Sequence, residues 1–97
     1  MLTLLARWQG ADARLWSYSV THRSLTIRLE ITGKEGYLDI YVGDTQRISA
    51  PTSWSNACFN LHKEGKDSFG EELVLLTDSI AHVEIVGGVV EVIEKRK

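Results

Sequence analysis

Apolar and polar residues alternate in short runs along most of the chain, as in strands that bury one face. The bulky apolar residues stand at even positions in the run 14–21 and at odd positions in the run 24–32. A tight turn at His22-Arg23, or a four-residue loop of the same parity, puts both rows on one face of a sheet. The expected buried row is Trp16, Tyr18, Val20, Leu25, Ile27, Leu29 and Ile31.

A third run, 37–42, follows the Gly-containing turn 33–36. It completes an antiparallel meander with the first two runs. One side of this run carries Leu38, Ile40 and Val42, and the other side carries Tyr37, Asp39 and Tyr41.

The middle of the chain has a weaker pattern. Residues 47–50 are expected to form a short edge strand, and 51–56 a loop that contains Trp54. The alternation returns at 57–62, which predicts another strand, and 63–70 is expected to be a charged loop.

The end of the chain predicts a second meander, with strands at 72–77, 80–86 and 89–94. Gly87-Gly88 suits a tight hairpin turn because glycine tolerates positive φ. Both faces of this meander are apolar in part, so each needs a cover. Residues 2–9, as a helix or a strand, are too short to cover three strands, which favours a homodimer. The alternative is that the first meander folds over this face and the domain is complete alone. The expected dimer face consists of Leu73, Leu75, Ile80 and Ile93, together with Val86 and Val89.

Length and composition fit one globular domain spanning residues 1–97. The chain has 43% hydrophobic and 25% charged residues, which excludes a disordered or collagen-like chain. The expected fold is mainly β: a small antiparallel β-sandwich or partly open barrel of seven to eight strands, with or without one short N-terminal helix.

Net charge and cysteine content limit the expected cellular location and the expected class of partner. The net charge is −2, and the only basic run, 95–97, is expected to be a solvated tail, so nucleic-acid binding is disfavoured. No apolar stretch approaches the length of a membrane span, and the first residues do not form a signal peptide. One cysteine permits no intrachain disulfide. We therefore expect a cytoplasmic, bacterial type of protein that does not enter a membrane.

The sequence offers no set of catalytic or metal-binding residues. His22, His62 and His82 lack metal-ligand spacing. Cys58, Asn60 and His62 share one face of a predicted strand, where Asn60 could orient the imidazole. Cys58 and His62 lie about 13 Å apart, however, too far for a thiolate–imidazole pair. The expectation is a protein without enzymatic activity, metal or cofactor.

Aromatic residues and one arginine are the candidates for partner binding. Arg28 is expected to form a cross-strand cation–π pair with Tyr41, and Tyr37 lies on the same exposed face. Trp54 either plugs the end of the core or anchors a partner. A basic–aromatic surface of this kind also occurs in proteins that bind single-stranded nucleic acid.

The run 22–29, His-Arg-Ser-Leu-Thr-Ile-Arg-Leu, and the later run 54–57, Trp-Ser-Asn-Ala, resemble short bacterial β proteins. Some of these are thought to act as immunity proteins against contact-delivered toxins. The resemblance covers about half the chain and assigns no residue a role. The expected function is a non-catalytic protein–protein interaction module, of an immunity type or self-associating. The alternative is a β domain that binds a small ligand or nucleic acid.

Overall fold

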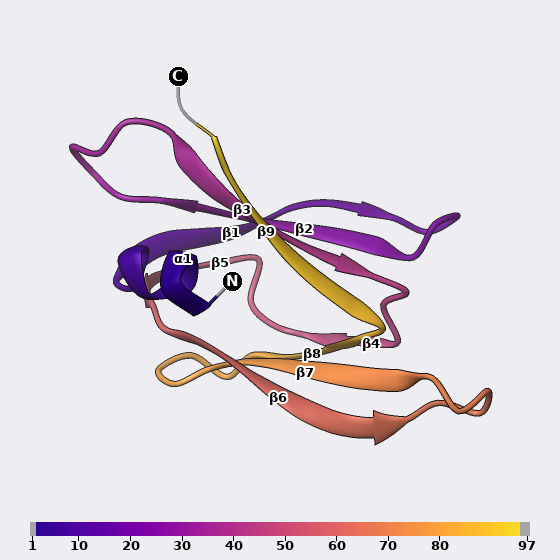
Figure 1. The fold of residues 1–97 in the computed structure, drawn as a ribbon. Helices are drawn as coiled ribbons and strands as arrows, with labels where there is room; N and C mark the ends of the chain where they lie inside the picture. Colours follow the sequence, from indigo (N-terminus) through magenta and orange to yellow (C-terminus); the bar gives the residue numbers. More distant parts are fainter. Residues whose placement is uncertain (1, 96–97) are drawn as a thin grey trace.

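The computed structural model describes residues 2–95, which form one short helix and nine β-strands in two antiparallel sheets (Figure 1). The strand order is β5-β1-β2-β3-β9 in the larger sheet and β4-β8-β7-β6 in the smaller sheet. The elements are α1 (Leu2–Arg7), β1 (Ala11–Ser19), β2 (Ser24–Glu30), β3 (Tyr37–Gly43), β4 (Arg47–Ser49), β5 (Ser53–Ala57), β6 (Phe59–Lys66), β7 (Glu72–Asp78), β8 (Glu84–Gly87) and β9 (Val89–Lys95).

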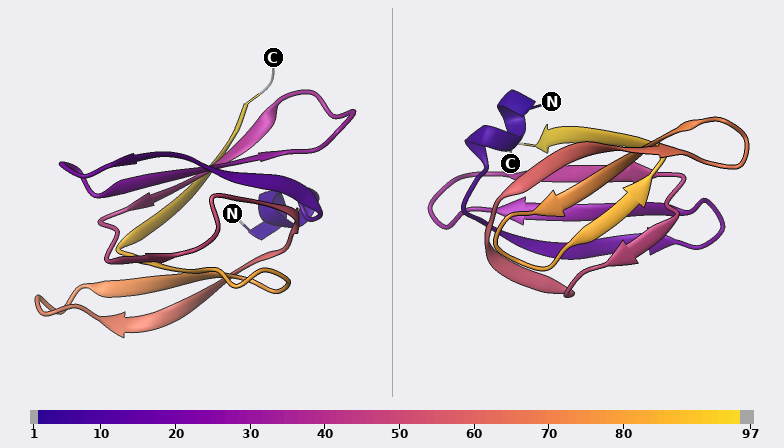
Figure 2. Two further views of the ribbon diagram at one scale, coloured as in Figure 1. Left: turned by 180° about the vertical axis from the view of Figure 1, so that it is seen from behind. Right: turned by 90° about the horizontal axis from the view of Figure 1, so that it is seen from below.

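The two sheets lie face to face as two layers, so the predicted mainly β, antiparallel sandwich is confirmed (Figure 2). The described residues contain one strand more than the seven to eight expected, because β5 forms where the run 51–56 was predicted to be a loop. Its polar sequence shows no alternation, yet Ala57 and Ser53 pair with β1 at the edge of the larger sheet. The predicted charged loop is also shorter, because β6 continues to Lys66.

The first meander is confirmed, and it forms the centre of the core. β1, β2 and β3 are consecutive antiparallel neighbours. Alternate residues of β2 and β3 point between the sheets and are at most 1% exposed: Leu25, Ile27, Leu29, Leu38, Ile40 and Val42. The smaller sheet covers them from the other side with Phe59, Leu76 and Ile85.

The predicted register of β1 is correct next to the turn and wrong beyond it. Residues 20–23 form the four-residue loop that the sequence allowed, and Tyr18 pairs with Leu25. Leu15 pairs with Ile27 but Ser17 pairs with Thr26, so Trp16 is the extra residue of a β-bulge. A one-residue shift moves a side chain to the opposite face. Trp16 is consequently 49% exposed on the solvent face, instead of lying in the buried row. The rest of that row also departs from expectation: Tyr18 is 45% exposed opposite Leu25, and Val20, in the four-residue turn 20–23, is 79% exposed.

The predicted second meander is wrong as well. β7 and β8 pair in the smaller sheet, but β9 pairs with β3 in the larger sheet. Gly87-Gly88 is therefore a crossing between sheets and not a hairpin turn. A Cβ atom on Gly87 would lie 2.4 Å from Cγ1 of Val42, so the absence of a side chain lets the crossing chain lie against β3.

This crossing separates the residues of the predicted dimer face. Leu73 and Leu75 lie on the outer face of the smaller sheet, where Leu75 is opposite Val86 of β8. Ile93 is opposite Asp39 on the larger sheet, and Ile80 lies in the loop between β7 and β8. The residues expected to form that dimer face therefore do not form one surface.

Residues 2–7 are helical, which settles the alternative left open by the sequence. α1 lies beside β9, where Arg7 Nη2 is 2.7 Å from Oε2 of Glu94. Trp8, directly after the helix, is 1% exposed within the core, and the ammonium group of Lys34 lies 4.2 Å from its ring centroid. Within residues 2–95 no helix is long and apolar enough to cross a membrane. Of the basic run 95–97, only Lys95 lies within the described residues.

Candidate functional site

The outer face of the larger sheet carries an arginine between two aromatic rings. Arg28 on β2 has Cζ 3.8 Å from the ring centroid of Trp16 on β1 and 3.8 Å from that of Tyr37 on β3. Its Nε and Nη2 donate to the two carboxylate oxygens of Asp39, at 2.8 and 3.1 Å. We call Trp16, Arg28, Tyr37 and Asp39 the arginine–aromatic cluster.

The register of the strands builds this cluster. Arg28 and Asp39 are direct partners across β2 and β3, so their side chains leave the sheet on the same face. The bulge in β1 turns Trp16 to that face as well. The contact between Arg28 and Asp39 is bidentate, which is the strong geometry for a guanidinium and a carboxylate. The hydrogen bond to Asp39 raises the pKa of Arg28 above its ordinary value, although partial burial works against it.

The expected partner of Arg28 is therefore corrected. Arg28 stacks on Trp16 and Tyr37, and not on Tyr41. Tyr41 is opposite Thr26 and Glu91, and it is half-buried on the same outer face. The structure thus brings three predicted residues, Arg28, Tyr37 and Tyr41, onto one surface and adds Trp16, which the sequence had placed in the core.

Two neighbouring features extend this surface. Ile93 is opposite Asp39 and is 44% exposed. On the other side, Arg14 is opposite Arg28 and also opposite Ser53 of β5. A groove of about 350 Å³ lies there, lined by Asp12, Ala13, Arg14, Ser53, Trp54 and Ser55. The cluster therefore adjoins an open polar groove at the edge of the sheet.

Trp54 lines this groove and also packs against the core. It is opposite the buried Ala13 and packs its ring against Phe59, with the two centroids 5.7 Å apart. Its indole Nε1–H donates to Oδ2 of Asp78 at 3.0 Å. Half-buried and hydrogen-bonded, Trp54 packs against the core, as the first of its two predicted roles requires. It also lines the groove, so its second predicted role, as an anchor for a partner, stays a prediction.

Asp78 is a structural residue that the sequence did not single out. Its carboxylate accepts hydrogen bonds from the amides of Cys58, Ile80 and Ala81 as well as from Trp54, at 2.8–3.0 Å. Burial alone would raise the pKa of Asp78, but these hydrogen bonds outweigh burial and hold the pKa below its usual value. Its place between the predicted strands 72–77 and 80–86 was the available signal, since Asp often binds backbone amides at turns.

The side chains considered for nucleophilic chemistry have other partners. Nδ2 of Asn60 donates to Oγ of Ser79 at 2.6 Å, and Nε2 of His62 lies 3.2 Å from Oγ1 of Thr77. Cys58 is a half-buried free thiol. His82 lines a shallow polar groove of about 290 Å³ between β4 and the β7–β8 loop. Within residues 2–95, no three His, Cys, Asp or Glu side chains are grouped so that they could hold a metal ion.

The arginine–aromatic cluster is the candidate functional site, in which the largely buried Arg28 and Asp39 support the exposed Trp16. It combines a fixed cation, two aromatic rings and an adjoining polar groove. Comparison with known proteins adds no assignment. No protein-family model, no curated protein and no solved structure matches this chain.

Proposed function

We propose that this protein is a non-catalytic interaction module that binds another protein through the outer face of its larger sheet. The observation that carries the proposal is the stacking of Arg28 between Trp16 and Tyr37 on an open sheet face. Trp, Tyr and Arg are the residues most enriched where a few side chains supply most of the binding energy.

The cluster is held in place before any partner arrives. Arg28 is fixed by two rings and by both oxygens of Asp39, and its side chain is only 17% exposed. Ordering a flexible side chain on binding costs about 0.5–1.5 kcal/mol, and a fixed side chain avoids this cost. Trp16 leaves 49% of its surface open above this support. It is therefore the natural central contact for a partner.

The charges on this face favour a protein partner over nucleic acid. The positive charge of Arg28 is balanced by Asp39. The face as a whole holds three basic and four acidic side chains: Arg14, Arg28, Lys95, Asp12, Glu30, Asp39 and Glu91. Such a surface releases few counterions from a phosphate backbone. It suits a protein that places one apolar side chain over Trp16, another over Ile93, and a basic or polar side chain in the groove beside Asp12. A toxin bound by an immunity-type protein is the specific form that the sequence resemblance suggests.

The test begins with a partner captured from the native cell and then measured in purified form. The wild-type protein and three single variants are titrated with the purified partner by calorimetry. Trp16→Ser and Tyr37→Ser should each weaken binding by about tenfold or more, as loss of a central contact does. Val20→Ser is the matched control, because it removes an exposed apolar side chain from the turn that follows β1. It should leave the affinity unchanged.

Two outcomes would overturn the proposal. One is a partner whose affinity is insensitive to Trp16→Ser and Tyr37→Ser. The other is tight binding of a single-stranded oligonucleotide that these same variants abolish, which would assign the face to nucleic acid. Thermal unfolding of each variant separates a lost contact from a lost fold.

A further inference from the structure

The β6–β7 hairpin extends past the rest of the smaller sheet. β8, the neighbour of β7, ends with Gly87 opposite Val74. Beyond that point Gly65 and Lys66 pair only with Leu73 and Glu72. Figures 1 and 2 show this arm reaching beyond the corner where β8 passes into β9. A two-stranded ribbon is marginally stable alone, so the arm gains from packing against another surface.

The tip of the arm is an ordered turn that presents one aromatic ring. Oδ1 of Asp67 accepts the amides of Phe69 and Glu71 at 2.8 and 3.0 Å, and the amide of Asp67 donates to the carbonyl oxygen of Glu71 at 2.9 Å. The amide of Gly70 donates back to the carbonyl oxygen of Asp67. Phe69 is nevertheless 89% exposed. The hydrogen bonds of the turn therefore hold the Phe69 ring in its exposed position.

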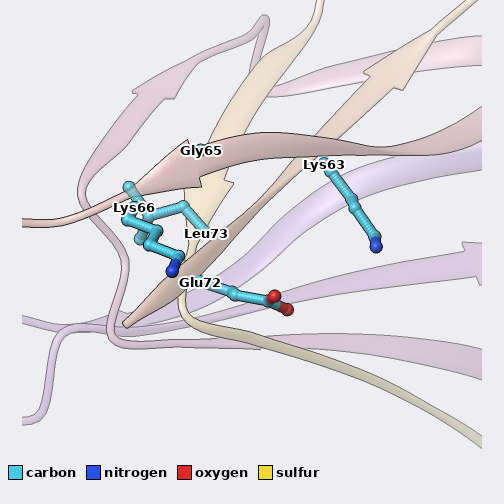
Figure 3. Close-up of a pocket in the computed structure, with 5 residues that line it drawn as sticks. All are labelled: Lys63, Gly65, Lys66, Glu72 and Leu73. Carbon is cyan, nitrogen blue, oxygen red and sulfur yellow. The ribbon is translucent and has the colours of Figure 1, made fainter. Parts of the chain in front are cut away.

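A small pocket lies on the same arm, next to this tip. It has a volume of about 130 Å³ and is lined by Lys63, Gly65, Lys66, Glu72 and Leu73 (Figure 3). A cavity of about 150 Å³ accommodates benzene, so the volume suits one phenyl ring. Figure 3 shows the side chain of Lys66, which has a long apolar stem, near Leu73, whereas the side chain of Lys63 points away from both.

We infer that the arm is a self-association element in which Phe69 of one copy enters the pocket of a second copy, and reciprocally. A two-fold dimer requires that one patch carry both halves of the contact, and this arm carries both the ring and the pocket. The charges agree with a second copy as the occupant. The tip carries two acids, Asp67 and Glu71, whereas the pocket carries Lys63 and Lys66 against one acid, Glu72. Acidic residues beside Phe69 disfavour insertion into an anionic membrane surface.

This contact is independent of the proposed function, since it uses the smaller sheet and leaves the arginine–aromatic cluster open. It also gives the expected homodimer a new location. Of the residues predicted to form the dimer face, Leu73 alone lines the pocket.

Sedimentation equilibrium over micromolar to millimolar concentrations tests the inference on the full chain. The wild-type mass should rise from 10.9 kDa toward twice that value. Phe69→Ser should weaken the dimer by about tenfold or more, and Val20→Ser, the matched control, should leave it unchanged. Lys66→Glu and Glu71→Lys should each weaken it, and the double variant should restore most of the loss, because the opposite charges are exchanged.

Three results would overturn the inference. The first is a wild-type protein that stays at 10.9 kDa throughout. The second is a dimer that Phe69→Ser leaves intact. The third is a monomer that binds anionic phosphatidylserine vesicles through Phe69, which would assign the tip to a lipid surface. Circular dichroism of each variant confirms that the fold is retained.

Discussion

The Asp78 carboxylate joins three segments of the sandwich, and replacing it by alanine should be strongly destabilising. It binds the amide of Cys58, the indole of Trp54 and two amides of the β7–β8 loop, and it is 8% exposed. A hydrogen bond to a charged group contributes about 1.5–3 kcal/mol. The loop amides can turn to water, so only the contacts to Cys58 and Trp54 are counted. We expect Asp78→Ala to lower the free energy of unfolding by about 3–6 kcal/mol, a large part of the roughly 5–15 kcal/mol of a small domain.

Urea unfolding at neutral pH, followed by tryptophan fluorescence, measures this loss. Asp67→Ala is the matched control, because Asp67 also accepts two backbone amides but lies at the exposed tip of the β6–β7 hairpin. That variant should lose about 1 kcal/mol or less. If Asp78→Ala loses no more than Asp67→Ala, the carboxylate does not stabilise the sandwich and the reasoning is wrong.

Asp78 should also make the stability of the protein depend on pH. The pKa of Asp78 in the folded protein lies below its ordinary value of 3.8. Its contribution is therefore fully present above that value and is lost as the pH falls through the lower, folded-state pKa. Stability of the wild type should fall over this acid range more steeply than that of Asp78→Asn, which has no charge to lose. Equal slopes for the two proteins would contradict this prediction.

Three further substitutions test other parts of the structure by urea unfolding. Ile27→Ala should cost about 2–4 kcal/mol, because the side chain is fully buried, and a loss below about 0.5 kcal/mol would contradict the assigned face. Arg28→Lys should cost about 1–2 kcal/mol through loss of stacking and of the bidentate contact, whereas Arg14→Lys at an exposed site should cost almost nothing. Gly87→Ala should cost about 1–3 kcal/mol, because its Cβ would overlap Val42, and an unchanged midpoint would show that the crossing has room to spare.

The central hairpin could be predicted because its signals are local. Alternation in 24–32 and 37–42 identifies the buried face, and the glycine turn between these runs leaves one antiparallel pairing. The bulge at Trp16 could not be predicted in this way. It shifts the register by one residue without interrupting the apolar pattern, so Trp16 reads as a core residue from its neighbours alone.

The placement of the last strand depends on long-range packing. Val90 and Val92 alternate in the same way whether β9 pairs with β8 or with β3, and Gly87-Gly88 permits both a tight turn and a close crossing. Long-range packing also explains why only part of the candidate site could be predicted. Arg28 and Tyr37 follow from the register of the meander, whereas Trp16 depends on the bulge and could not be identified as their partner.

The crossing at Gly87-Gly88 has a consequence for the order in which the molecule folds. β3 acquires its second neighbour only when β9, more than forty residues later, reaches it. The chain also passes between the sheets from β3 to β4, from β4 to β5 and from β5 to β6. Such long-range pairing makes folding slow, because the entropy of closing long loops is lost before the contacts form. Until β9 docks, β3 keeps an unpaired edge that invites association with other chains. During synthesis the larger sheet therefore stays incomplete, and prone to aggregation, until β9 has left the ribosome.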